Sequence, residues 1–311
     1  MIAFGPVPSR RLGQSLGINN IPPKNCPYSC VYCQVGKTTR MEVARRQYYP
    51  VDRIIEDVRL KIDKSLARDE KIDYLTFVPD GEPTLDINLG RELEAIGRFG
   101  FKTAVITNAS LLWRDDVREA LQHADLVSVK IDAFQEDVWR KINRPHRRLR
   151  MEHILNGILT FARSYHGELI TETMLVKDMN EEESNIIDLA MFLSVVEPAM
   201  AYLAIPTRPP ALQHIQAPDE AAINRSYQLF SQHLDHVEYL IGYEGDAFAC
   251  TGNVAEDILS IAAVHPMRED ALRKMLGRSH AGWELIEKLT AEGKLTETDY
   301  MGQHFYLRKV G

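Results

Sequence analysis

The chain has 311 residues, enough for one large domain or for a large domain followed by a small one. Hydrophobic residues make up 45% of the chain and charged residues 26%, as is usual in globular proteins. The sequence contains no run of about 18 apolar residues, so no membrane-spanning helix is predicted. The formal net charge of −7 argues against a chain-wide affinity for nucleic acid but leaves room for a local basic patch.

The first 250 residues alternate strand and helix patterns. Strands are predicted at 15–21, 73–78, 102–107, 126–132, 169–176 and 201–206, with a short one at 237–245. Most are continuous apolar runs, typical of strands that are buried on both faces. Helices are predicted at 51–69, 89–100, 113–124, 151–166, 181–196 and 218–234. Six repeated strand–helix units predict an α/β fold, a partial (β/α)6 barrel, with its chemistry at the C-terminal ends of parallel strands.

The pattern changes near residue 250. Three short helices are predicted at 253–266, 267–277 and 279–295, with Ser279 capping the third, and a hairpin follows. Three helices and a hairpin predict a winged-helix domain, so we place the barrel at 1–250 and the winged-helix-like domain at 251–311. The third helix is net acidic, which makes DNA an unlikely partner. Docking on the barrel, or binding of a protein or peptide, fits its charge better.

Three of the four cysteines, Cys26, Cys30 and Cys33, fall within eight residues with C-x3-C-x2-C spacing. The N-terminus lacks the features of a secretory signal, so we expect a cytoplasmic protein and a metal site rather than disulfides. A structural zinc ion needs a fourth ligand, for which only Cys250 or a distant histidine remains. An iron–sulfur cluster on three thiolates would instead keep one iron open to a small molecule. Cys250 itself is expected to be a buried small apolar residue.

The cysteine spacing, with Tyr32 before the last cysteine, resembles the signature of the radical S-adenosylmethionine (SAM) superfamily. Gly81-Glu82-Pro83 after the second predicted strand resembles that superfamily's glycine–glutamate motif, and Asn108 follows the third strand. The resemblance implies that the cysteines hold a [4Fe-4S] cluster whose open iron binds SAM. One electron then cleaves SAM to a 5′-deoxyadenosyl radical that abstracts a substrate hydrogen. The implied SAM-binding residues are Tyr32, Gly81, Glu82, Pro83, Asn108 and Ser128.

Structural roles remain as alternatives for three of these residues. Tyr32 could pack the loop, Glu82 could belong to a plain turn, and Asn108 could cap a strand end.

Residues 4–39 resemble proteins related to the enzymes of wyosine-base formation in transfer RNA. The demethylwyosine synthases bind a second cluster through cysteines that precede the radical SAM loop. This chain has no cysteine before Cys26, so we expect shared ancestry rather than a shared reaction.

Basic residues suggest an anionic substrate. Arg10 and Arg11 precede the first predicted strand, and the segment 140–150 carries six Lys and Arg residues. The guanidinium group of arginine can donate two parallel hydrogen bonds to a phosphate or carboxylate group. A run of charged residues is, however, usually an exposed face in contact with solvent. Glu172, on the fifth predicted strand, could point into the barrel or only stabilise it. The candidate catalytic residues are Arg144, Arg208, Lys130 and Asp132.

The sequence leaves three alternative functions. The first is a radical SAM enzyme acting on a small-molecule, nucleotide-like or peptide substrate, reduced by a donor such as flavodoxin or ferredoxin. The second is a wyosine-type tRNA-modification enzyme, which the net charge of −7 does not favour. The third is a metal-dependent winged-helix regulator, which the acidic third helix disfavours. No membrane partner is expected.

Overall fold

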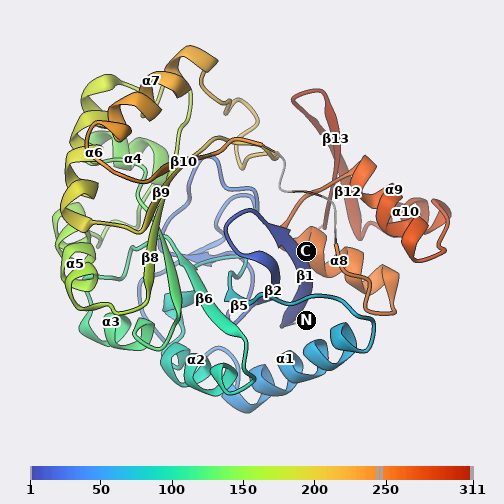
Figure 1. Ribbon diagram of the computed structural model, residues 1–311. Coiled ribbons are helices and arrows are strands. Elements are labelled where there is room, and N and C mark those ends of the chain that lie inside the picture. The colour runs from blue at the N-terminus through green and yellow to red at the C-terminus, as the bar shows by residue number, and fades with distance from the viewer. Residues whose placement is uncertain (1, 243–244, 246–247, 309–311) are drawn as a thin grey trace.

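The computed structural model describes residues 2–242, 245 and 248–308. Its centre is a curved eight-stranded sheet in the order β1-β2-β5-β6-β7-β8-β9-β10 (Figure 1). Only β1 and β2 pair antiparallel, and every other neighbouring pair is parallel. The strands are β1 (Ala3–Ser9), β2 (Gly13–Ile18), β5 (Tyr74–Phe77), β6 (Lys102–Thr107), β7 (Leu126–Lys130), β8 (Glu168–Met174), β9 (Met200–Ala204) and β10 (Val237–Leu240).

Helices cover the convex face of this sheet (Figure 1). The main core lies between the two layers and includes Phe77, Val105, Phe161 and Phe230, all fully buried. Because most central strands are apolar on both faces, the sheet is covered by helices rather than exposed to solvent on one face. The covering helices are α1 (Val51–Leu66), α2 (Leu89–Gly97), α3 (Asp115–Leu121), α4 (Glu136–Asn143), α5 (Met151–Ser164), α6 (Glu183–Val196) and α7 (Glu220–Ser231).

The predicted α/β architecture with a mostly parallel sheet is confirmed, but 15–21 is not the first strand. An additional strand, β1, precedes it and forms a hairpin with β2. The sequence of β1, AFGPVPS, contains two prolines, which obscure a strand pattern but are tolerated at the edge of a sheet. The helix α4 and the two-residue strands β3 (Asn25–Cys26) and β4 (Arg40–Met41) were also not predicted.

The predicted strand 237–245 is shorter in the structure, where β10 ends at Leu240, and residues 243–244 lie outside the described residues.

The C-terminal segment contains the three predicted helices and the terminal hairpin. Its elements are α8 (Val254–Val264), β11 (Met267–Arg268), α9 (Glu269–Arg278), α10 (Glu284–Ala291), β12 (Leu295–Tyr300) and β13 (Gln303–Arg308). The prediction that Ser279 caps the third helix is wrong. Its backbone N–H donates to the carbonyl of Met275, so Ser279 ends α9 instead of starting α10. Residues 309–311 of the predicted hairpin lie outside the described residues.

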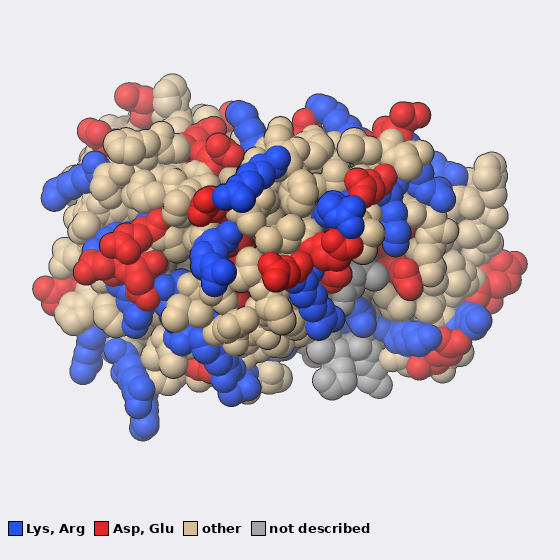
Figure 2. All heavy atoms as spheres, turned by 90° about the horizontal axis from the view of Figure 1, so that it is seen from below, with Lys and Arg blue, Asp and Glu red and all other residues tan. Residues whose placement is uncertain are grey.

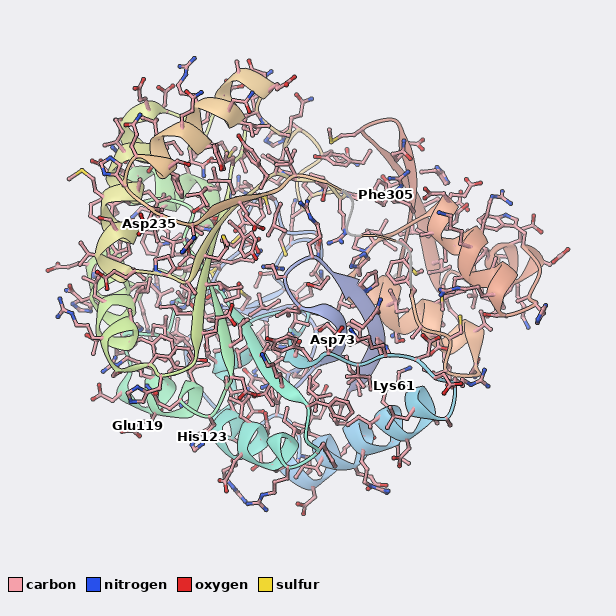
Figure 3. The ribbon with its side chains drawn as sticks, viewed as in Figure 1. Lys61, Asp73, Glu119, His123, Asp235 and Phe305 are labelled. Carbon is pink, nitrogen blue, oxygen red and sulfur yellow. The ribbon has the colours of Figure 1, made fainter. Side chains whose placement is uncertain are left out.

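The C-terminal segment packs beside β1, on the side of the molecule opposite α5 and α6 (Figure 1). Phe4 and Val7 of β1 share a second buried cluster with its helices α8, α9 and α10. Lys61, on the side of α1 that faces this segment (Figure 3), forms a buried ion pair of 2.9 Å with Asp257 of α8. The segment is therefore joined to the sheet by both apolar and ionic contacts, while the boundary near residue 250 stays a prediction.

The face seen from below carries both signs of charge. Figure 2 shows Lys and Arg side chains interspersed with Asp and Glu side chains, without a continuous basic field. Such a surface offers little to a polyanion. None of the described helices is long and apolar enough to cross a membrane.

Candidate functional site

A cavity of about 230 Å³ lies at the C-terminal ends of the parallel strands. The cysteine loop after β2 forms one wall, and the ends of β5 and β6 form the next. Residues at or after β7, β8, β9 and β10, together with Arg11 between β1 and β2, complete the lining. The three clustered cysteines all line this cavity, at the sheet edge where the strand pattern predicted the chemistry.

Two asparagine side chains donate hydrogen bonds to the cysteine sulfurs. Nδ2 of Asn108, just after β6, lies 3.2 Å from Sγ of Cys26, and Nδ2 of Asn143, at the end of α4, lies 3.3 Å from Sγ of Cys30. The backbone N–H of Tyr28 also donates to Cys26 Sγ at 3.4 Å. These donors favour sulfurs that carry negative charge, as thiolates bound to metal do.

The surroundings of Cys26 and Cys30 favour the protonated thiol over the thiolate. Burial raises the pKa of Cys26 well above its ordinary value, and the neighbouring Cys30 and Glu82 add to this. Burial also raises the pKa of Cys30 to about 12, with Asp132 contributing. Binding of iron must therefore release these protons, so metal loading is expected to weaken as the pH falls.

Gly81 and Glu82 fasten the end of β5 to the cysteine loop. A Cβ atom on Gly81 would lie 2.1 Å from the carbonyl oxygen of Asn25, so no other residue fits without moving the loop. The backbone N–H of Glu82 donates to that same oxygen at 3.1 Å. The position therefore requires glycine because the two backbones touch.

The Glu82 carboxylate is occupied by protein donors. It accepts hydrogen bonds from N and Oγ1 of Thr84, from Oγ1 of Thr107 and from the backbone N–H of Asn108. Three of these bonds end on Oε1 and one on Oε2, so Oε2 can still accept a further hydrogen bond. Glu82 therefore ties β5 to β6 and places Asn108 against Cys26. Its predicted contact with SAM remains a prediction.

One part of the cavity lining is cationic; we call Arg11, Lys130, Glu172 and Arg208 the cationic wall. Arg11 pairs with Glu172, whose Oε1 is also 2.7 Å from Nζ of Lys130. Burial alone would raise the pKa of Glu172, but Arg11 and Lys130 lower it to about 2. The wall thus carries three cations and one ionised carboxylate.

Arg208 connects the cavity to the C-terminal segment. Its Nη1 donates to Oε1 of Gln34 at 2.8 Å, and its Nη2 lies 3.0 Å from Nε2 of His265. Nε2 of Gln34 donates to the backbone carbonyl of Val264 at 3.0 Å. Val264 at the end of α8, and His265 through Arg208, therefore support Gln34, the residue that follows Cys33 in the sequence.

A sequence model of the radical SAM superfamily matches residues 20–190, which contain all three cysteines and the Gly81-Glu82 motif. The chain belongs to the radical SAM superfamily. A UPF0026 protein of Methanocaldococcus jannaschii is 46% identical over 311 residues, covering 99% of this chain and 96% of that relative. A UPF0026 protein of Synechocystis is 38% identical over 213 residues, covering 68% and 77% of the two chains.

Two solved structures share the fold of this radical SAM protein. TYW1 with a lysine-pyruvate adduct bound gives a TM-score of 0.53 at 14% identity, covering 71% of this chain and 74% of that one. A radical SAM methyltransferase from Sphaerobacter thermophilus gives 0.53 at 15% identity, covering 73% and 66%. At these identities the likeness concerns the fold alone, and the wyosine-related subgroup stays a prediction.

The donor set fits the iron–sulfur cluster of a radical SAM protein. Three thiols line one cavity, and two of them receive hydrogen bonds. Among the described residues, no three His, Cys, Asp or Glu side chains are grouped to hold a single metal ion. A tetrahedral zinc ion would need such a group within about 2.3 Å of one point. Three thiolates are the ligand set that leaves one iron of a cluster open to a small molecule, whereas a structural zinc ion requires a fourth ligand.

Of the other predicted site residues of this radical SAM protein, some line the cavity and others lie outside its lining. Tyr32 lines the cavity, and its hydroxyl donates to Asp132, which lies behind the lining with Ser128. Pro83 is buried at the start of a short 3₁₀ helix, Pro83–Leu85. Arg144 is exposed at the end of α4 and does not line the cavity.

Sequence reasoning missed three contributors to the site: Gln34, His265 and the contact of Asn143 with Cys30. Gln34 carried a usable signal because it directly follows Cys33, and Asn143 carried one because Asn143-Arg144-Pro145 resembles a recurring element of the wyosine-related subgroup.

Proposed function

We propose that this chain is a radical SAM enzyme that acts on an anionic substrate bound at the cationic wall. The observation that carries the proposal is that the three thiols and the cationic wall line one cavity. When bound, the [4Fe-4S] cluster supplies the electron that cleaves SAM to a 5′-deoxyadenosyl radical, which abstracts hydrogen from the substrate.

The chain's own residues hold and orient the groups. Cys26, Cys30 and Cys33 would ligate three irons and leave the fourth for SAM. Asn108 and Asn143 stabilise charge on two of the sulfurs through hydrogen bonds. Nζ of Lys130 lies 5.9 Å from the centre of the Tyr32 ring, so the cationic wall contacts the cysteine loop through this side chain.

An anionic group on the substrate follows from the charge balance of the cavity. Three half-buried cations and two carboxyl groups, Glu172 and Glu82, line the cavity, and Glu82 is held by donors of the protein, so positive charge is in excess at the cationic wall. Nε of Arg11 is buried and makes no hydrogen bond within the described residues. A carboxylate or phosphate would satisfy such donors, since arginine presents its N–H groups as a fork.

The reaction class is tested by anaerobic purification and reconstitution with iron and sulfide. We expect a brown protein with about four irons per chain that releases 5′-deoxyadenosine when dithionite and SAM are added. Replacing Cys26, Cys30 and Cys33 by Ser removes both properties, whereas Cys250→Ser keeps them. A colourless protein that retains one zinc ion per chain after anaerobic isolation would contradict the proposal.

We also propose that the C-terminal segment is a winged-helix-like element that serves the enzyme rather than DNA. Gln34 and Arg208 at the cavity contact Val264 and His265, and Tyr300 of β12 donates to the carbonyl of Pro206 after β9. A gel-shift assay on random-sequence duplex DNA should show no complex at 0.15 M salt. A retarded band that Lys288→Glu on α10 abolishes would favour the regulator instead.

A further inference from the structure

Exposed basic residues surround the outer side of the cysteine loop; we call Lys37, Arg144, Arg147 and Arg148 the basic rim. All four are exposed, and none lines the cavity. They form no ion pair with other described residues, although the neighbouring Arg140 pairs with Glu136. The rim is therefore a local excess of positive charge on a chain whose net charge is −7.

Backbone hydrogen bonds join the rim directly to the cysteine loop. The N–H of Ser29 donates to the carbonyl of Asn143 at 3.0 Å, and the N–H of His146 donates to the carbonyl of Pro27 at 2.8 Å. A β-bridge links Tyr28 to Pro145, and Thr38 Oγ1 donates to the Tyr28 carbonyl at 2.6 Å. The charges of 144–148 and Lys37 thus lie on segments that hold the cysteine loop from outside.

Asn143 extends this connection to a cysteine sulfur. The residue directly before the exposed Arg144 contacts Cys30 Sγ through its side chain while its carbonyl binds Ser29. A single residue, Asn143, therefore connects the basic rim to the cysteine Cys30. The cavity, where SAM and substrate would be bound, is lined by the cysteines and by none of the rim residues.

We propose that the basic rim is the docking surface for an acidic one-electron carrier protein of the flavodoxin or ferredoxin kind. The inference rests on the proposed function, which needs one electron from outside for each SAM cleaved. The carrier loses that electron, the cluster gains it, and no bond or proton changes place. Opposite charges on the two proteins would speed their encounter and orient the carrier on the loop.

The position of the rim favours an electron carrier over an RNA. A polyanionic substrate would need positive charge leading into the cavity, whereas the rim residues lie outside its lining. Transient redox partners meet through small interfaces, below about 1,200 Å² of buried surface.

The proposal is tested with Arg147→Glu/Arg148→Glu and a matched control, Arg53→Glu/Arg91→Glu. The control arginines are equally exposed, lie in the first turns of α1 and α2, and form no ion pair with other described residues. The first readout is calorimetric binding of purified flavodoxin, and separately ferredoxin, to the reconstituted chain at 20 mM and 200 mM salt. We expect the rim variant to bind the carrier at least about tenfold more weakly at low salt, and the control to bind like the native chain.

The second readout separates docking from chemistry. With reduced flavodoxin as the donor, 5′-deoxyadenosine formation by the rim variant should fall about tenfold. With dithionite it should match the native rate, because a small reductant needs no docking surface. If dithionite yields no 5′-deoxyadenosine from the native chain, the proposed function fails, while the binding experiment still decides the docking surface.

Three results would overturn the docking proposal. The native chain could fail to bind either carrier at low salt, or the rim variant could bind it as well as the native chain does. The third is salt-sensitive binding of total tRNA that the rim variant loses while it keeps carrier binding, which would assign the rim to RNA.

Discussion

Asn108 and Asn143 reach the cysteine sulfurs from two different elements, the end of β6 and the end of α4. A hydrogen bond to a cluster sulfur stabilises the more negative, reduced state and so raises the reduction potential. The two side chains thus adjust how easily the cluster accepts its electron, a property that the spacing of the cysteines alone does not determine.

Replacing Asn108 by Ala should lower the midpoint potential of the cluster. Loss of one such bond, worth about 0.5–1.5 kcal/mol, corresponds to roughly 20–60 mV for one electron. The potential is measured by redox titration monitored by electron paramagnetic resonance, with iron content determined in parallel. Ser110→Ala, which removes a neighbouring hydroxyl, is the control. An unchanged potential at full iron content would show that Asn108 does not contact the cluster-bound sulfur.

Glu92 on α2 is a fully buried acid outside the cavity, within 3.2 Å of Nδ2 of Asn20. Burial, with a smaller contribution from Asp86, raises its pKa to about 8. The native carboxyl therefore keeps its proton to about pH 8, whereas the unfolded chain ionises near pH 4.5. Stability conferred by the protonated form is present in acid and is lost as the pH rises between these values.

Glu92→Gln should remove this pH dependence. The variant is expected to unfold with a free energy near that of the native chain at pH 5, and to be more stable by roughly 2–4 kcal/mol at pH 8. Urea unfolding at pH 5, 7 and 8 measures the difference, with Glu94→Gln on the exposed face of α2 as the control. Parallel pH profiles of native chain and variant would show that Glu92 is ionised in the folded state.

Among the helices and strands, those that show a single strong local sequence pattern were predicted best. The apolar runs of β6 and β7 are buried on both faces, so their sequence alone marks them as central strands. The edge strand β1 was not predicted from the sequence, because its prolines interrupt the strand pattern. It is a strand only through its pairing with β2. The helix α4 was not predicted, since its basic residues were considered for anion binding and for a solvated face of helix and loop.

The packing of α1 against α8 depends on a contact that no local pattern contains. Nζ of Lys61 lies 2.9 Å from both Asp257 Oδ1 and Thr251 Oγ1, and the two charged side chains are 8% and 3% exposed. Such a pair is costly to break from one side, because the remaining charge stays buried without its partner.

Lys61→Met should therefore loosen the C-terminal segment, at a cost of about 3 kcal/mol. Hydrogen exchange measured by mass spectrometry should speed up in α8 more than in α5 or α6. Lys64→Met, a change at an exposed lysine of the same helix, should leave exchange unaltered. Adding Asp257→Leu to Lys61→Met should restore part of the protection, and its failure to do so would exclude the ion pair as the cause.

Across the whole molecule, the candidate site was predictable to the extent that it lies in sequence motifs. Cys26, Glu82 and Asn108 each follow a strand, and parallel strands bring their ends together. His265 and Gln34 lie 231 residues apart in the sequence, yet both contact Arg208. That meeting depends on how the C-terminal segment packs, which neither composition nor periodicity reveals.

The same packing bears on whether residues 251–311 unfold independently. Phe4 and Val7 of β1 are buried against the C-terminal cluster that contains Leu272 and Met275. Because the first strand of the sheet completes that cluster, we expect sheet and C-terminal segment to unfold in one transition. Trp283 reports on the segment, while Trp113 and Trp139 report on the larger part.

Leu272→Ala, at a fully buried position of α9, should lower stability by about 3 kcal/mol and shift both transitions together. The experiment uses two backgrounds, Trp113→Phe/Trp139→Phe and Trp283→Phe, so that fluorescence follows one part at a time during urea unfolding. If only the Trp283 transition moves, the segment is a separate cooperative unit, as a boundary at residue 250 would require. Coincident shifts would show that β1 links the two parts, so that loss of the C-terminal segment would also unfold the sheet edge beside the cavity.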